Sequence, residues 1–415
     1  MFTMNASLEN IKNGINELDQ FNSTKGQGTT RILFTDVELE AREYIKDKMK
    51  MNGLTVEEDA IGNIFGVLEG QDPKLPPIWS GSHIDTVKHA GKFDGMAGVI
   101  AALEAQRMIK EAGMKHKRTI KSVVFTSEEP TRFGLCCLGS RALAGELQRK
   151  DLREICDEDE ESLEQVLERL GYDLNAFHLI KKSNHDVYAS VELHIEQGAV
   201  LEQLGKPIGI VDAIAGPSNI TVTIEGVQEH AGSTPMPIRV DALTAASEIV
   251  LKVEALAKGS SSEHTVGTVG FMEVYPNASN AIPGKVTFTI DLRDSDMAVK
   301  EEVLQELLSS FKEIESKRQV SIHYVVDNHD QPMHCDNHIN SMIEKICLRK
   351  SIDYNRMISG AYHDSIFVGK FAPISMIFVP SQGGLSHNPN EWTDFEDIKL
   401  GTEILAESLL TLANE

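Results

Sequence analysis

Residues 81–98 read Gly-Ser-His-Ile-Asp-Thr-Val-Lys-His-Ala-Gly-Lys-Phe-Asp-Gly-Met-Ala-Gly, and this stretch decides the expected fold. An apolar run ends in small residues just before His83, and a helical pattern begins after Asp94. This order predicts a strand, a polar loop and a helix. Because the carboxyl ends of strands in an open α/β sheet face the ligand crevice, we expect His83, Asp85 and Asp94 to point into one. An imidazole and two carboxylates there are candidate metal-binding groups.

Three further predicted strands, 120–126, 188–193 and 373–379, are each followed by side chains that can bind a metal ion. The first of them completes a βαβ unit, which returns its carboxyl end to the edge where the first loop lies. One such side chain alone is a weak indication, whereas five that converge on one sheet edge predict a site for divalent cations. The five candidate ligands are His83, Asp94, Glu129, His194 and His387.

Two carboxylates beside these ligands suggest other roles. Glu128 adjoins Glu129, and adjacent side chains cannot occupy equivalent positions, so one of the two can bind metal while the other acts as general base. Asp85 follows His83 by two residues and can accept the second ring N–H of that imidazole, as in many metal sites. An Asx-turn is the alternative interpretation of Asp85.

The whole pattern predicts an α/β protein with an inserted second domain. Residues 215–327 follow the order β-α-β-β-α-β, which is the ferredoxin-like arrangement. We expect a catalytic domain with a central mixed sheet from residues 1–214 and 328–415, and an inserted α+β lid or dimerisation domain. An edge strand of the insert could pair across a two-fold axis, which predicts a homodimer. The acidic stretch 151–170 is expected to be helical.

Composition limits the partners and the compartment. The chain has 40 basic and 63 acidic residues, and its net charge of -23 opposes binding to nucleic acid and to anionic membranes. Five cysteines, with Cys136 and Cys137 adjacent, argue against a disulfide framework. No stretch approaches the ~18 apolar residues of a membrane span, and the N-terminus lacks a signal-peptide pattern. We therefore expect a cytoplasmic protein.

The ordered motifs resemble those of a known hydrolase family, from about residue 30 to the C-terminus. The signature of di-metal aminoacylase and carboxypeptidase-type hydrolases is similar to His83-Ile84-Asp85, Asp94-Gly95, Glu128-Glu129, His194-Ile195-Glu196-Gln197-Gly198 and His387-Asn388. The branch of N-carbamoyl-L-amino-acid hydrolases, allantoate amidohydrolases and ureidoglycolate amidohydrolases is indicated by residues 229–236, 280–283, 291–294 and 359–364. Residues 127–134, Ser-Glu-Glu-Pro-Thr-Arg-Phe-Gly, look most like ureidoglycolate amidohydrolases.

The resemblance implies a role for each group of residues. Asp94 would bridge two divalent cations, Zn or Mn with Co or Ni as further options, and Glu128 would be the base. His230, from the smaller domain of the same or the partner subunit, would stabilise the oxyanion. The substrate would be held by Gln197, Asn280, Arg293 and the Gly360 backbone. The planar fork of Arg293 can bind both oxygens of a carboxylate, which indicates an acidic substrate.

The predicted function is a metal-dependent amidohydrolase that uses a metal-activated water to cleave the C–N bond of a ureido or N-carbamoyl carboxylate. An aminoacylase or dipeptidase with the same metal pair is the alternative, and a non-catalytic binding module is the hypothesis from another class. The residues in the smaller domain have plainer alternatives: an ion pair of Arg293 with Asp291 or Asp294, a solvated loop for His230 and a turn for Asn280. Gln197 could cap a turn. A cluster of His329, His334, Cys335 and His338 is interpreted as linker, because it lacks paired Cys-x-x-Cys spacing.

Overall fold

The computed structural model describes residues 4–415 and divides them into two compact units. Unit 1 comprises the described part of Met1–Asp212, with His334–Met357 and His363–Glu415. Unit 2 comprises Ala213–Met333 and Ile358–Tyr362. The second segment of unit 2 is a short excursion that the sequence pattern does not reveal. Of the helices in residues 4–415, none combines the length and the apolar character needed to cross a bilayer.

A nine-stranded mixed sheet is the framework around which unit 1 is built. Its strands are β1 (Thr55–Glu58), β2 (Ile64–Leu68), β3 (Ile78–His83), β4 (Ile120–Phe125), β5 (Ala189–Ile195), β6 (Ile208–Ile214), β13 (Met333–His334), β14 (Tyr354–Ser359) and β15 (Ile374–Val379). The order is β1-β2-β4-β3-β5-β15-β6-β13, and β14 pairs with β6. The four central strands β4, β3, β5 and β15 are parallel to one another, so their carboxyl ends share one edge. This confirms the predicted mixed α/β sheet.

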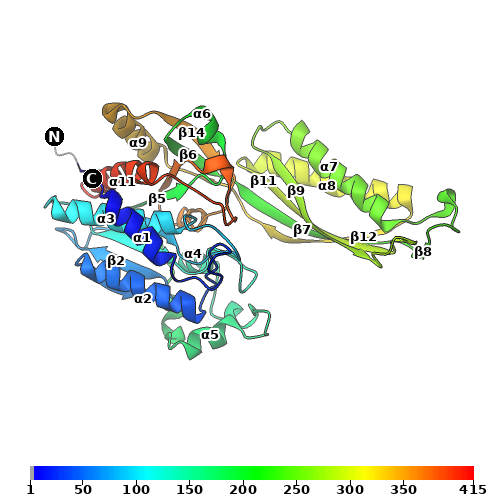
Figure 1. Ribbon diagram of the computed structural model, residues 1–415, viewed down its shortest axis with the longest axis horizontal. Coiled ribbons are helices and arrows are strands. Elements are labelled where there is room, and N and C mark those ends of the chain that lie inside the picture. The colour runs from blue at the N-terminus through cyan, green and yellow to red at the C-terminus, as the bar shows by residue number, and fades with distance from the viewer. Residues whose placement is uncertain (1–3) are drawn as a thin grey trace. The chain divides into compact units, whose positions relative to one another are not determined.

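Helices cover this sheet, which explains why its central strands are buried. Every residue of β3, β5 and β15 is buried, as expected for parallel strands with both faces covered. The helices are α1 (Leu8–Leu18), α2 (Asp36–Met51), α3 (Met96–Glu111), α4 (Leu138–Ala144), α5 (Leu163–Arg169), α6 (Val200–Leu204), α9 (Asn337–Lys350), α10 (Ser365–Val368) and α11 (Phe395–Leu412). Of these, α1, α3 and α11 pack against one another (Figure 1), and α4 packs against α10. The sheet edge with its loops is thereby held on a rigid core.

Unit 2 has a four-stranded antiparallel sheet with its own apolar core. Its elements are β7 (Gly216–Glu225), β8 (Glu229–His230), α7 (Ala242–Gly259), β9 (Val266–Tyr275), β10 (Ala281–Ile282), β11 (Lys285–Asp294), α8 (Met297–Arg318) and β12 (Ser321–His329). The sheet order β12-β7-β11-β9 with two helices is the ferredoxin-like arrangement, as predicted. Both helices cover the same face of this sheet (Figure 1). The small pair β8 and β10 forms a separate ribbon.

The helix predicted for the acidic stretch 151–170 is the clearest error in the predicted secondary structure. A short 3-10 turn, Asp151–Arg153, and the helix α5 are separated by a loop. In that loop the Asp157 carboxylate accepts the backbone N–H groups of Asp159 and Glu161, at 3.1 and 3.0 Å. Such a side-chain bond offers the backbone an alternative to the helix, so helical spacing alone was misleading there.

Candidate metal centre

Two buried histidines of unit 1 face one carboxylate at the carboxyl edge of the sheet. His83 is the last residue of β3 and His194 the next-to-last of β5, whereas the sequence predicted both just beyond their strands. Their Nδ1 atoms lie 3.0 Å from the Asp85 carbonyl and 2.9 Å from the Ile195 carbonyl. Because a carbonyl only accepts, each Nδ1 carries a proton and each Nε2 is the ring nitrogen that faces the carboxylate. The Nε2 atoms lie 3.7 and 3.3 Å from Asp94 Oδ1.

The other oxygen of Asp94 faces a second pair of potential ligands. Nε2 of His387 lies 3.2 Å from Asp94 Oδ2 and 3.3 Å from Glu129 Oε1. Asp94 therefore belongs to two groups of three donors, each with its donor atoms within 4.8 Å of one another. One carboxylate shared by two such groups fits a pair of divalent cations, since the potential ligand atoms are imidazole nitrogens and carboxylate oxygens. The structure thus brings together all five predicted ligands.

Gly95 explains why a glycine follows the shared aspartate. Its φ of +68° is in the left-handed region, and a Cβ there would come within 2.5 Å of the His83 ring. Both the backbone turn and the close approach of the imidazole therefore require glycine. The helix α3 starts at the next residue, Met96.

Asp85 supports the site in a different way from the one predicted. Its carboxylate lies 3.7 Å from His83 Nδ1, too far for a hydrogen bond, and its backbone carbonyl accepts that ring N–H instead. The carboxylate accepts the backbone N–H groups of Glu128 and Glu129, at 3.3 and 3.0 Å. Asp85 therefore joins the loop after β3 to the loop after β4. The predicted contact failed because these N–H groups occupy the carboxylate.

The predicted base, Glu128, is buried beside the ligands, with Oε2 3.8 Å from His83 Nε2. Burial, reinforced by the charge of Glu129, raises the pKa of Glu128 well above its usual value. For Asp94, burial acts in the same direction, but hydrogen bonds with His194, His387 and His83 hold its pKa well below the ordinary range. Hydrogen bonds with Asp94 and Glu129 raise the pKa of His387 to about 10. Cations bound here would replace the protons that balance these carboxylates.

Gln197, a predicted substrate residue, lies in unit 1 against the shared aspartate. Its Nε2 donates to Asp94 Oδ2 at 2.8 Å and to the Ser386 hydroxyl at 3.2 Å. Its Oε1 is buried and has no hydrogen-bond partner within the described residues. A buried acceptor of this kind is costly unless a ligand or a water satisfies it.

Two buried residues next to His194, Glu192 and His363, were not among the predicted site residues. Glu192, His194 and His363 form a third group whose potential donor atoms lie within 4.8 Å of one another. The oxygens of Glu192 already accept the hydroxyls of Ser82 and Ser365, at 2.8 and 2.6 Å. The ring of His363 packs edge-on against that of His194, with centroids 4.6 Å apart. The alternation of polar residues within β5 was the available signal for Glu192.

The other predicted site residues all lie in unit 2. Nδ1 of His230 accepts the backbone N–H groups of Gly232 and Ser233, at 3.0 and 3.1 Å. Its Nε2 therefore carries the proton and can donate it to an oxygen. Ala231 donates to the Asn280 carbonyl at 2.9 Å, so His230 and Asn280 belong to the same ribbon.

Arg293 forms the ion pair that was weighed as the alternative to substrate binding. Its Nε and Nη2 donate to the two oxygens of Asp291, both at 2.8 Å. Its Nη1 donates to the Gly360 carbonyl at 2.9 Å. Arg293 and Gly360 also line a cavity of about 450 Å³ in unit 2 together with Asn219 and Thr268. The guanidinium is therefore fixed in orientation at the wall of this cavity.

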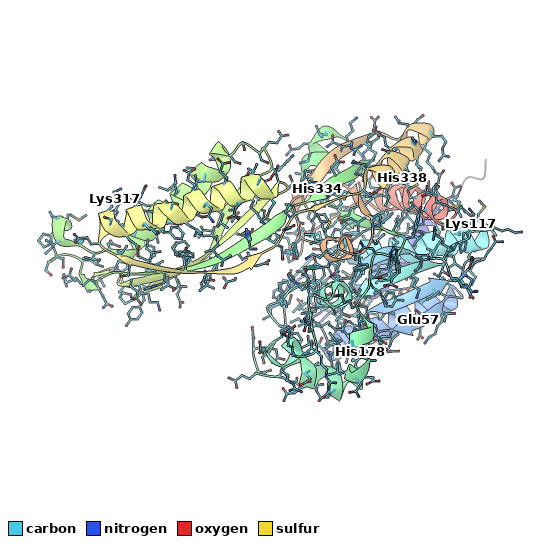
Figure 2. All side chains as sticks on the ribbon, turned by 180° about the vertical axis from the view of Figure 1, so that it is seen from behind. Glu57, Lys117, His178, Lys317, His334 and His338 are labelled. Atoms are coloured by element: carbon cyan, nitrogen blue, oxygen red, sulfur yellow. The ribbon has the colours of Figure 1, made fainter. Side chains whose placement is uncertain are left out.

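The cluster of histidines around residue 334 does not form a metal site among residues 4–415. His329 belongs to unit 2, where its ring contacts Ser218 and Glu301. His334 and His338 belong to unit 1 and are separate in Figure 2. His338 pairs with Glu415 at 3.0 Å.

Unit 1 has a mixed α/β sheet with overlapping groups of His and carboxylate side chains at its carboxyl edge, and unit 2 is ferredoxin-like. This combination defines a class of metal-dependent hydrolases. The model of peptidase family M20/M25/M40 matches residues 79–411, and the chain belongs to this family.

This chain is similar to known relatives over nearly its whole length. A ureidoglycolate hydrolase of Arabidopsis thaliana is 40% identical over 99% of this chain and 88% of the relative. An N-carbamoyl-L-amino acid amidohydrolase of Geobacillus stearothermophilus is 38% identical over 96% of each. The crystal structure of AtUAH in complex with glyoxylate has a TM-score of 0.88 and 40% identity, over 99% of both chains. The chain is thus an amidohydrolase of the N-carbamoyl-L-amino acid, allantoate and ureidoglycolate branch.

Proposed function

We propose that this enzyme hydrolyses a ureido carboxylate, with ureidoglycolate as the first candidate and N-carbamoyl-L-amino acids and allantoate as the next. The observation that carries the proposal is the shared carboxylate of Asp94, whose two oxygens face two separate ligand groups. The 40% identity to a ureidoglycolate hydrolase and the motif of residues 127–134 support ureidoglycolate. Its hydrolysis at the ureido carbon would give hydroxyglycine, carbon dioxide and ammonia.

Two divalent cations would be held by five residues in this proposal. Imidazole and carboxylate donors suit Zn²⁺, Mn²⁺, Co²⁺ and Ni²⁺. Bound cations would supply Lewis acidity, polarising a carbonyl and lowering the pKa of water from 15.7 toward about 7. The ligands are His83, Asp94 and His194 for one cation and Asp94, Glu129 and His387 for the other.

Glu128 would move the proton in the reaction. A carboxylate with a raised pKa is suited to accept a proton from the attacking water and to donate it to the leaving nitrogen. The unpartnered Oε1 of Gln197 fits an N–H group of a ureido substrate, since its Nε2 is already committed to Asp94. We assign oxyanion stabilisation to the Nε2–H of His230, and recognition of the substrate carboxylate to Arg293 with Asn280 and Gly360.

We further propose a homodimer in the cytoplasm. The outer edge of β9 has no strand partner among the described residues, and it exposes Val266, Phe271 and Tyr275. An edge strand with exposed apolar side chains favours pairing with a second copy across a two-fold axis. Buried thiols at Cys137, Cys335 and Cys347 support a reducing compartment.

A substrate panel with metal analysis tests the proposal. The purified chain would be stripped with a chelator, reloaded with Mn²⁺, Zn²⁺, Co²⁺ or Ni²⁺, and assayed for ammonia released from ureidoglycolate, allantoate and N-carbamoyl-L-amino acids. We expect activity only in the reloaded samples and the highest kcat/KM for ureidoglycolate. Turnover of N-acyl amino acids or dipeptides alone would instead assign an aminoacylase or dipeptidase. Failure to cleave any of these compounds would favour a binding module.

A further inference from the structure

Glu391 is a buried carboxylate that the sequence motifs did not single out. Only 4% of its surface is exposed. Its Oε1 accepts the backbone N–H groups of Phe93 and Asp94, at 2.9 and 3.1 Å. Its Oε2 accepts the hydroxyl of Ser386 at 3.0 Å. The hydrogen bonds of this side chain therefore involve the shared ligand, the residue before it and the residue before His387.

These contacts join two loops that each carry a ligand. The first is the loop between β3 and α3, which ends at Asp94. The second is the loop of residues 386–391, in which the Ser386 hydroxyl also lies 3.2 Å from Asp94 Oδ2. The two loops approach each other closely, because a Cβ at Gly91 of the first loop would lie 2.3 Å from the Glu391 side chain of the second. Glu391 thus fixes the distance between the two loops.

The two ligand groups depend on this connection to different degrees. His83 and His194 lie within buried strands that the sheet holds in register. His387 lies in a loop, its side chain is 50% exposed, and its φ of +53° is in the left-handed region. The packing of the sheet therefore positions the two histidines of the first group, whereas only its loop positions His387.

We propose that Glu391 is a positioning residue that sets the second cation group, Asp94, Glu129 and His387, and leaves the first group largely unaffected. The inference rests on the cation pair of the proposed function and does not depend on the substrate. Carboxylates that orient ligands in this way commonly change metal affinity by about 10- to 100-fold when they are removed.

Stepwise cation binding tests this role without any activity assay. The full chain would be stripped with a chelator and titrated with Co²⁺, and heat and visible absorption would be followed for wild type, Glu391→Gln and Ser386→Ala. For Glu391→Gln we expect the second Co²⁺ to bind about tenfold more weakly or worse, and the first to stay within about threefold of wild type. Ser386→Ala removes one of the three contacts, so it should weaken the same second step by a smaller factor.

Asp336→Ala is the matched control. This carboxylate also accepts two backbone N–H groups in unit 1, those of His338 and Ile339 at 2.9 and 3.0 Å, at the start of α9. The Asp336→Ala variant should have a lower Tm than wild type, and its affinities for the first and the second Co²⁺ should be unchanged. Equal weakening of both steps, or no change in the second, would overturn the role of Glu391. If Glu391→Gln does not fold, the same comparison of the first and second Co²⁺ affinities is made with Ser386→Ala, and a second affinity equal to that of wild type would overturn the role. A wild type that binds only one Co²⁺ would overturn the cation pair and this role together.

Discussion

The candidate metal centre of unit 1 and the candidate substrate residues of unit 2 differ in how they are held. In unit 1 the ligands are almost all buried, and the Nε2 atoms of His83 and His194 are presented by carbonyls that fix their Nδ1 protons. In unit 2, His230 and Asn280 are exposed and Arg293 is paired with Asp291. The first region is organised for cations in the absence of substrate, whereas the second offers donors on a surface. Cation binding should therefore be separable by mutation from the roles of the unit 2 residues.

The largest expected effect is on the proton-transfer step in unit 1. Glu128→Gln keeps the shape of the side chain and removes its basicity, so kcat should fall by about 10³-fold while two cations still bind. Ammonia release and cation stoichiometry measure the two properties. Glu104→Gln is the control, because this buried carboxylate on α3 bonds Ser7 and Arg107 away from the ligands. A loss in kcat of less than tenfold for Glu128→Gln would remove Glu128 from the base role.

The next effect should come from the exposed donor of unit 2. His230→Ala removes the Nε2–H, and kcat should fall by about 10²-fold with cation binding unchanged. His264→Ala, at an exposed histidine of the same unit, should leave kcat unchanged.

Mixing subunits tells which copy supplies His230. Mixed Glu128→Ala and His230→Ala subunits should regain part of the activity if the partner supplies this histidine. Weaker cation binding in His230→Ala alone would contradict the separation between the two regions.

A smaller effect is expected at the guanidinium of unit 2. Arg293→Lys keeps the charge but loses the bidentate pair with Asp291 that fixes this group at the cavity wall, so KM should rise by about tenfold with a lesser change in kcat. Steady-state kinetics on the preferred substrate separates the two constants. Arg318→Lys, which pairs with Glu248 on the same unit, serves as the control. A fall in kcat with KM unchanged would mean that Arg293 acts in the reaction step.

The last effect concerns stability instead of activity, through a buried amine in unit 2. Lys300 donates to the carbonyls of Gly216 and Asp330, and burial lowers its pKa to about 8. The unfolded chain holds this proton up to pH about 10.5, so the contribution of the neutral amine to stability is present above that value and is lost as pH falls through 8. The free energy of unfolding of wild type relative to Lys300→Met should therefore rise by about 3 kcal/mol or less between pH 8 and 10.5. The Tm of wild type and of Lys300→Met, measured across this pH range, checks this increase. A Tm difference between the two proteins that does not change with pH would contradict the lowered pKa of Lys300.

The predictability of the two regions from sequence also differs. Strand-like runs that end in polar residues located β3, β4, β5 and β15, and the topology then fixed which side chains meet. The loop ligand His387 was predicted in the same way, from the polar stretch that follows the strand 373–379. Glu391 was missed because its role depends on hydrogen bonds to the backbone of a loop nearly 300 residues away, and Ser386 because it contacts the side chains of Asp94 and Glu391; neither kind of contact leaves a periodic pattern.

Local competition explains two of the remaining errors. The Asp85 carboxylate was assigned to His83 by its spacing, yet the N–H groups after β4 are better placed for it. The side chain of Asp157 likewise interrupted a helix that spacing had favoured. Short-range spacing could not anticipate partners that the fold supplies.

Anomalous scattering from crystals of the Mn²⁺-loaded enzyme tests the central claim most directly. The expected result is two peaks about 3.5–4 Å apart, one on each side of the Asp94 carboxylate. One peak should lie against His83 and His194, and the other against Glu129 and His387. A single peak, or a second peak between Glu192 and His363 in place of the His387 position, would contradict the shared-carboxylate pair.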